Sequence, residues 1–301
     1  MTAAPLPPES SIARRYGAAR VTLAIAAVLF STGGAAIKMS VLTSWQVACL
    51  RSGIATLVLA VAWPLGRTGW TRRTLVVAIT YATCVVSFVS ATKLTTAANA
   101  IYIQSTAPLY ILLVAPLVLR ERIRRHDYVI VALIAAGLLA FFISADAPQA
   151  SAPNPLLGNG LAVISGLSYA GMLIGFRWMQ KPGPGHADAA TVIVAGNLLA
   201  ALVCVPLAWP LPAMGTVDWS VVGFLGIVQI GIAYVLVTRG VKHVPAFEAS
   251  LILLLEPALN PVWTWLTLGE VPSRLAICGG LLILSATVAK SWLEARAPTT
   301  T

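Results

Sequence analysis

Charged residues are scarce in this 301-residue chain. Lysine, arginine, aspartate and glutamate make up 10% of it, whereas ordinary soluble domains contain about 25%. Hydrophobic residues make up 58%, and the mean hydropathy is +0.86. A soluble core in a chain of this length cannot enclose so much apolar surface, so the composition excludes an ordinary water-soluble protein.

Catalytic and metal-binding signatures are also missing. The sequence contains no H-E-x-x-H, G-x-S-x-G or P-loop motif, and its four cysteines are spread singly without a C-x-x-C. We therefore expect no enzyme activity, no cofactor and no bound metal, and we interpret the cysteines as small buried hydrophobic residues. The net charge of +10 does not indicate nucleic acid, because the basic residues form short clusters between apolar segments, as topogenic signals do.

Long apolar runs recur along the whole chain. Each is close to the length of about 20 residues that crosses the hydrocarbon core of a bilayer as a helix. The sequence therefore predicts an all-α integral membrane protein with ten transmembrane helices. The predicted spans are 21–37, 45–65, 74–92, 96–119, 128–143, 157–177, 190–209, 219–237, 246–268 and 275–292.

The connections divide the chain into two halves. Most are very short, and the longest polar link is 144–156, rich in proline, alanine and serine. We expect a first five-helix unit over 21–143 and a second over 157–292, with tails at 1–20 and 293–301. The polar first 20 residues precede a full-length apolar segment, so we expect no cleaved signal peptide.

The positions of lysine and arginine predict the orientation. With the N-terminus inside, sixteen basic residues fall on the inner side and three on the outer side, namely Lys38, Lys93 and Arg274. The sequence thus predicts a multi-pass protein of the cytoplasmic membrane with both termini in the cytoplasm.

The two halves resemble each other. Residues 93–121 align without a gap with residues 242–270, a shift of 149 positions, and eight of the 29 pairs are identical. The identities include a lysine, a proline and a glutamate at one register. Because five spans separate the copies, and five is odd, the second copy must insert upside down. Inverted repeats of this kind are typical of secondary transporters.

Proline interrupts the matching spans near their middle. Pro108 cannot donate to the carbonyl of Gln104, and Pro257 cannot donate to that of Leu253. Free carbonyls at this depth are tolerated only where they face protein or a water-filled cavity. Pro108 and Pro257 therefore predict paired broken helices that act as gates, although a packing kink without a ligand stays open as an alternative.

Glu256 precedes Pro257 in the middle of its span. A charged carboxylate at this depth is costly, so it must be protonated, paired or wetted. It suits contact with a cationic substrate group or proton coupling, and it could alternatively brace the kink through a hydrogen bond between helices.

Other polar side chains share helix faces within the spans. They could line a polar cavity, or they could be the small and hydroxyl residues that hold membrane helices together. The candidate substrate-binding residues are Asn99, Tyr102, Thr106, Ser168, Tyr169, Gln229, Glu256, Asn260 and Trp263.

Three further charges are interpreted as structural. Arg51 lies six residues into its span, where we expect it to reach the near interface, although a buried carboxylate is an alternative partner. Glu121 and Glu270 end their spans beside loops, where we expect them to satisfy backbone donors or pair with arginines.

The repeats carry a resemblance to a known family. The stretches "TTAANAIYIQSTAPLYILLVAPLVLRERI" and "PAFEASLILLLEPALNPVWTWLTLGEVPS" resemble the paired repeats of the EamA-type family in the drug/metabolite transporter superfamily. The match covers roughly 21–290. The resemblance implies two inverted five-helix units, a central cavity, alternating access, and transport of amino acids, other small metabolites or drugs. The first repeat has Ala107 where the second has Glu256, so an acid-based mechanism would rest on the second half.

Two classes of function follow from these patterns. The inverted repeat predicts a secondary transporter of a small molecule, most naturally an exporter. A non-transporting membrane sensor or scaffold is the alternative, and it would be favoured by a soluble signalling domain, for which the predicted tails leave little room.

Overall fold

The computed structural model describes residues 9–63, 70–118, 125–143, 150–179 and 188–295, and every element in these ranges is a helix. Ten segments of the described chain are long and apolar enough to cross a membrane, as the sequence predicts. Six of them are single helices: α3 (Ser44–Ala62), α4 (Arg72–Leu94), α7 (Arg125–Ile143), α8 (Pro155–Met179), α9 (Ala189–Ala208) and α14 (Arg274–Ala295).

The other four spans are interrupted. Their parts are α1 (Glu9–Ser31) with α2 (Gly33–Met39), α5 (Ala97–Gln104) with α6 (Ala107–Val118), α10 (Thr216–Gly223) with the π-helix η1 (Phe224–Ile232) and α11 (Ala233–Gly240), and α12 (Ala246–Leu253) with α13 (Leu255–Leu268). The sequence predicts the breaks at Pro108 and Pro257. It does not predict the break in the first span or the π-helix.

The two proline breaks lie at matching positions. The chain leaves helical geometry at Ser105 and Thr106 in the first repeat and at Leu254 in the second, and a shift of 149 places Ser105 on Leu254. Each break lies just before its proline, as expected where the missing N–H frees a carbonyl one turn earlier. The second proline of span nine, Pro261, lies inside α13, which continues past it.

The packing of the helices repeats between the halves. α3 packs on α9 and α7 packs on α14, so two helices each contact their own counterpart. α4 of the first unit packs along α8 of the second, and α11 and η1 of the second unit pack on α1 of the first in the corresponding place. Because each unit has an odd number of spans, counterpart helices run in opposite directions. This arrangement is that of two inverted units.

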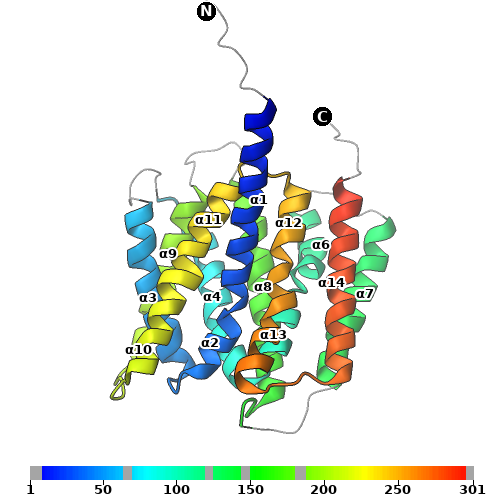
Figure 1. The fold of residues 1–301 in the computed structure, drawn as a ribbon. Coiled ribbons are helices and arrows are strands. Elements are labelled where there is room, and N and C mark those ends of the chain that lie inside the picture. The colour runs from blue at the N-terminus through cyan, green and yellow to red at the C-terminus, as the bar shows by residue number, and fades with distance from the viewer. Residues whose placement is uncertain (1–8, 64–69, 119–124, 144–149, 180–187, 296–301) are drawn as a thin grey trace, which may run out of the picture.

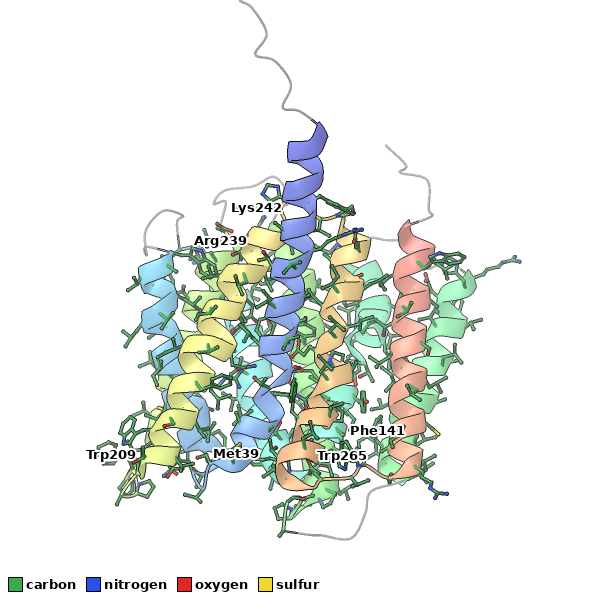
Figure 2. The ribbon with its side chains drawn as sticks, viewed as in Figure 1. Met39, Phe141, Trp209, Arg239, Lys242 and Trp265 are labelled. Carbon is green, nitrogen blue, oxygen red and sulfur yellow. The ribbon has the colours of Figure 1, made fainter. Side chains whose placement is uncertain are left out.

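The chain begins and ends at the same end of the bundle (Figure 1). We call this the proximal end, and we call the opposite end, where α2 ends and α10 begins, the distal end. Arg239 and Lys242 lie at the proximal end, and Trp209 and Trp265 lie at the distal end (Figure 2). The two tryptophans are 72% and 56% exposed, as aromatic side chains at a membrane interface are.

The two ends of the bundle differ in how they are closed. At the distal end, α2 packs on α4 and α5, and α13 packs on α5. By the repeat, the counterpart of the contact between α2 and α4 is α8 with α11, and the counterpart of the contact between α2 and α5 is α8 with α12. Both counterparts lie at the proximal end. In the described part of the chain, neither of these pairs is packed to a comparable extent. The structure is therefore closed at the distal end.

Candidate functional site

The break in the first repeat is covered by α8. Pro108 is the second residue of α6, so the Gln104 carbonyl receives no helical hydrogen bond from it. Gly166 lies against this carbonyl, and a Cβ at this glycine would be 3.1 Å from the Gln104 oxygen. The Gln104 side chain donates from Nε2 to Ser165 Oγ over 2.7 Å. Protein groups thus surround the first break.

The break in the second repeat exposes a carboxylate. Glu256 lies in the first turn of α13, where the positive end of the helix dipole stabilises a negative charge. This position explains how the chain accepts an acid at this depth. Within the described part of the chain, Glu256 is partly exposed and has no hydrogen bond or direct ion pair.

Arg51 of α3 points into the bundle, so the expectation that it reaches the interface is wrong. The residue is 4% exposed, and its Nε and Nη1 atoms have no hydrogen-bond partner in the described structure. Its charge acts on Glu256, although the two side chains do not form a direct ion pair. The alternative reading, that Arg51 serves a buried carboxylate, is closer to this geometry.

Tyrosines from three helices complete this region. Tyr81 of α4 accepts a hydrogen bond at its hydroxyl from Asn197 Nδ2 over 2.9 Å, and its ring centroid lies 6.1 Å from that of Tyr234 of α11. Tyr169 of α8 is 37% exposed, so protein leaves part of its surface uncovered, and the charges of Glu256 and Tyr234 act on it. We call the following residues the central polar cluster: Arg51, Tyr81, Tyr169, Tyr234 and Glu256.

Three candidates from the first repeat lie elsewhere. Asn99 is buried and donates to Thr95 Oγ1 and Asn159 Oδ1, each over 3.4 Å. The ring of Tyr102 packs against Phe141, with centroids 5.9 Å apart. Thr106, between α5 and α6, is fully buried, and its hydroxyl donates to the Ile103 carbonyl of α5 over 2.6 Å. The structure therefore gives these three residues protein partners away from the central polar cluster.

Two candidates of the second repeat surround the break between α1 and α2. Trp263 Nε1 donates to Ser31 Oγ over 2.8 Å, and Gln229 Nε2 donates to the Phe30 carbonyl over 3.2 Å. These bonds satisfy groups at the end of α1, where the helical ladder stops. The predicted polar face of α13 thus divides: Glu256 lies within range of the charge of Arg51, whereas Trp263 bonds to α1.

Asn260 of α13 lies beside the same break. Its amide is buried, and neither Oδ1 nor Nδ2 has a hydrogen-bond partner among the described residues. A Cβ at Gly34 would lie 2.5 Å from Oδ1, so only glycine leaves room for the amide. Ser168, the remaining candidate, is partly exposed on α8 beside Tyr169.

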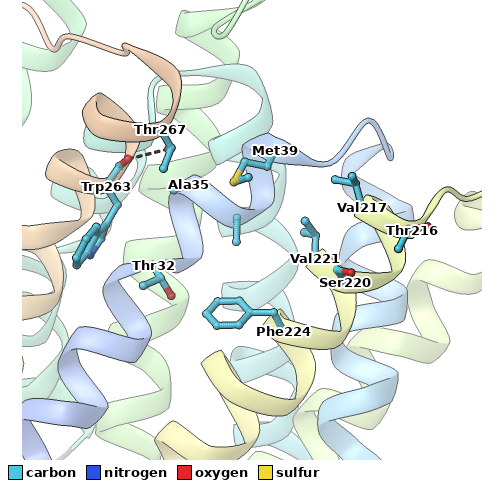
Figure 3. A pocket seen from close by; sticks show the side chains of 11 residues that line it. Thr32, Ala35, Met39, Thr216, Val217, Ser220, Val221, Phe224, Trp263 and Thr267 are labelled. Atoms are coloured by element: carbon cyan, nitrogen blue, oxygen red, sulfur yellow. Dashed lines mark hydrogen bonds between the residues drawn. The ribbon is translucent and has the colours of Figure 1, made fainter.

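A groove lies on the side of the bundle beside Trp263. It has a volume of about 430 Å³ and lies between α2, α10, η1 and α13 (Figure 3). Phe224, Val221 and Met39 line it, and Thr267 donates to the Trp263 carbonyl over 2.7 Å at its edge. The lining residues include no charged side chain, so the groove lacks the chemistry of the central polar cluster.

A second set of buried charges closes the distal end. Lys38 Nζ lies 3.2 Å from Glu270 Oε1, and the two side chains are 5% and 1% exposed. Glu270 Oε2 accepts from the backbone N–H of Ala97 over 3.1 Å, and Lys38 donates to the carbonyls of Thr95 and Ser151. We call these residues the distal charge network. It joins the first span, the start of α5, the link between the halves and the end of α13.

The backbone at the end of α13 directs Glu270 into this network. Gly269 adopts φ 65°, a left-handed conformation that favours glycine, and ends the helix. Glu270 therefore turns back into the bundle, where its structural role agrees with the expectation, although its partner is a lysine. Glu121, its counterpart in the first repeat, lies outside the described residues.

Sequence reasoning missed part of both sites. From its position in the sequence, Lys38 indicates only the topology, and the pattern does not single out Tyr81 or Tyr234. A lysine near the outer end of a span is the signal that could have suggested the distal charge network. The tyrosines carry no signal apart from their polarity within apolar segments. In the described part of the chain, no group of three or more His, Cys, Asp or Glu residues is placed to hold a metal.

The comparisons with known proteins agree on a family. The EamA-like transporter family matches residues 19–143 and 156–291. The pseudopaline exporter CntI of Pseudomonas aeruginosa strain UCBPP-PA14 is 25% identical over 197 residues, which cover 64% of this chain and 66% of the exporter. The uncharacterized transporter YwfM of Bacillus subtilis strain 168 is 26% identical over 178 residues, covering 56% and 57% of the two chains.

The fold is also found among solved structures. A crystal structure superposes with a TM-score of 0.61 at 21% identity, covering 94% of this chain and 99% of the other. The match to the exporter spans just under two thirds of that protein's length. The family assignment therefore rests on the family model, which matches both repeats. With ten membrane-spanning segments and both repeats matched, this chain belongs to the EamA-like transporter family.

Proposed function

We propose that this protein is a secondary transporter that exports a small metabolite, an amino acid or a related compound, or a drug across the cytoplasmic membrane by alternating access. Membership of the transporter family and ten membrane-spanning segments support transport itself. The observation that carries the mechanism is the pair of helix breaks at matching positions of two inverted units. Broken helices in such positions mark the substrate site of many secondary transporters.

The packing supports one state of an alternating-access cycle. The distal end is closed by helix contacts and by the distal charge network, whereas the corresponding proximal pairs are less packed. If the helix contacts at the distal end opened and the corresponding contacts at the proximal end formed, the central polar cluster would become exposed to the distal side. The approximate two-fold relation makes both patterns compatible with the same fold.

The distribution of basic side chains supports the orientation of the protein in the membrane and the direction of transport. Basic side chains gather at the proximal end, where Arg239 and Lys242 lie, and the positive-inside rule assigns such an end to the cytoplasm (Figure 2). The structure then corresponds to a state closed toward the outside, which loads its substrate from the cytoplasm. The name of the Pseudomonas relative, an exporter, supports the same direction. Glu256 is the group that would carry a proton if transport is coupled to one.

Efflux from proteoliposomes tests this function. Vesicles containing the purified chain would be loaded with a mixture of amino acids, other metabolites and cationic dyes, and the release of each would be measured with and without a pH gradient. Transport predicts that at least one compound leaves faster than from protein-free vesicles of the same lipid. If no compound leaves faster under either condition, the proposal is wrong and a sensor or scaffold role gains support.

A further inference from the structure

Two opposite charges in the middle of the bundle have no partner. Arg51 is 4% exposed, and its Nε and Nη1 have no hydrogen bond within the described chain. Glu256 is partly exposed and likewise has no hydrogen bond or direct ion pair there. Buried polar groups in native proteins are almost always satisfied, and buried charges are paired. This arrangement therefore indicates a ligand that supplies the missing partners.

The two side chains are held apart by the fold. Arg51 belongs to α3 and Glu256 to α13, and these helices are not packed against each other to any major extent in the described structure. Each nevertheless lies within range of the charge of the other, so the two residues belong to one region of the bundle. Tyr169 borders this region and keeps 37% of its surface exposed. Protein therefore leaves part of the surface of Tyr169 and Glu256 uncovered.

We propose that Arg51 and Glu256 form a two-point receptor for a zwitterionic substrate, with Arg51 binding a free carboxylate and Glu256 binding a free amine. The proposal rests on the proposed transport function and names its substrate class. The planar guanidinium presents two N–H groups in the geometry of a carboxylate. Glu256 accepts hydrogen bonds only when ionised, and an ammonium group donates three.

The tyrosines suit the remainder of such a substrate. Tyr81 and Tyr234 stand near Arg51, and the ring of Phe30 packs edge-on against Tyr234 with centroids 5.1 Å apart. Aromatic faces bind apolar or aromatic groups and also favour a nearby cation. The Oδ1 atom of Asn197, which has no hydrogen-bond partner in the described structure, is a further acceptor close to Tyr81.

Other substrate classes leave part of the cluster unsatisfied. A simple anion would neutralise Arg51 and leave Glu256 without a partner, and a simple cation would do the reverse. A neutral compound would leave both charges uncompensated, at a cost in binding. Only a ligand with both signs satisfies both residues at once.

Matched compounds test the requirement for two charges. The probes are L-leucine, L-phenylalanine and L-tryptophan, each with its carboxamide, which lacks the carboxylate, and its N-acetyl derivative, which lacks the amine. Proteoliposomes would be loaded with all nine compounds together with a cationic dye and a dicarboxylate. We expect release of free amino acids to exceed that of their own derivatives by about tenfold or more, the effect of losing a hydrogen bond to a charged group.

Variants assign the two charges. Arg51→Gln and Glu256→Gln should each reduce release of the amino acids by about tenfold or more. The double variant Arg51→Glu with Glu256→Arg keeps both signs and should recover part of the activity. Arg72→Gln, at the exposed first residue of α4, is the matched control and should behave as wild type. Size-exclusion profiles and thermal unfolding in detergent would show that every variant is folded.

The outcomes separate this proposal from transport itself. If the wild-type protein releases the dye, the dicarboxylate or the blocked derivatives as fast as the free amino acids, or releases those compounds alone, the receptor is wrong and transport stands. Wild-type release by folded Glu256→Gln would also overturn the receptor and reduce this residue to a brace of the kink. If none of the compounds is released, the receptor proposal fails together with its basis in transport.

Discussion

Lys38 with Glu270 at the distal end, and Arg51 with Glu256 in the central polar cluster, are two sets of opposite charges within one membrane protein. The first pair is in contact at 3.2 Å, and both side chains have further partners in the backbone of other elements. The second set is not in contact, and two nitrogen atoms of Arg51 have no hydrogen-bond partner in the described structure. The difference separates charges that hold the fold from charges that await a ligand.

The elements that carry the charges explain this difference. Glu270 follows the left-handed Gly269 and caps the start of α5, so the fold brings it to Lys38 whether or not a ligand is present. Arg51 and Glu256 come from helices of different units that do not pack closely together. Any change in the relative position of the two units alters the distance between them. A ligand that binds both residues can therefore favour one arrangement of the units.

The largest predicted effect is on the distal pair. Glu270→Ala leaves Lys38 buried without its anion, and removing one partner of a buried ion pair costs about 3–5 kcal/mol. We expect this loss in the free energy of unfolding, measured by denaturant titration in mixed micelles. The double variant Lys38→Met with Glu270→Leu should recover most of it, because it removes both charges. A single variant as stable as wild type would show that the pair does not hold the distal end.

Replacing the central charge should have the opposite effect on stability. Arg51→Met keeps most of the length of the side chain and removes a charge that has no hydrogen bond to lose in the described structure. We expect the free energy of unfolding without ligand to be unchanged or higher, in the same denaturant titration, while transport is lost. A destabilisation as large as that of Glu270→Ala would contradict the contrast between the two sites.

The two proline breaks should differ in the same way. Pro108→Ala and Pro257→Ala both restore a backbone N–H that can close the helix, so both should impair transport more than folding. The break at Pro108 is surrounded by Gly166 and Ser165, whereas the break at Pro257 presents Glu256. We therefore expect a larger loss of efflux from Pro257→Ala, measured in proteoliposomes at matched protein content. Unchanged efflux in both variants would reduce the prolines to packing features.

The sequence predicts the frame of this protein better than its site. Hydropathy and the repeat at a shift of 149 are local signals, and they predict the ten spans and the two matched breaks. The surroundings of Arg51 depend on which faces of distant helices meet, and periodicity within one helix carries no information about this. The face of α13 illustrates the limit, because Trp263 bonds to Ser31 of α1 whereas Glu256, on the same predicted face, lies within range of the charge of Arg51 on α3.

Local chemistry also overrides some of the expected roles. Asn99 lies on the predicted polar face, but Thr95 and Asn159 satisfy its amide. A polar side chain in a membrane helix gains as much from a partner helix as from a cavity, and the sequence does not distinguish the two. The π-helix at η1 lies beside Arg51, since a Cβ at Gly226 would be 2.9 Å from the Arg51 carbonyl. No composition rule predicts such a segment, although π-helical turns are frequent at functional sites.

The smallest perturbation is a single exposed cysteine, and its labelling tests on which side of the membrane the pair of Lys38 and Glu270 lies. Ala150 is exposed in the link between the halves, next to Ser151, whose carbonyl accepts a hydrogen bond from Lys38 at the distal end. Lys242 is exposed at the proximal end. In a background without Cys49, Cys84, Cys204 and Cys278, Ala150→Cys should react with an impermeant maleimide in intact cells. Lys242→Cys should react only after permeabilisation, because the basic end is assigned to the cytoplasm.

Neither substitution touches a buried side chain, so we expect no measurable change in stability or transport. The result nevertheless fixes the meaning of the closed end. If Ala150→Cys reacts in intact cells, the distal charge network closes the outer side, and the central polar cluster is loaded from the cytoplasm, as export requires. If it reacts only after permeabilisation, the network closes the cytoplasmic side. The structure would then represent a state that loads from outside, and the argument for export from this conformation would be lost.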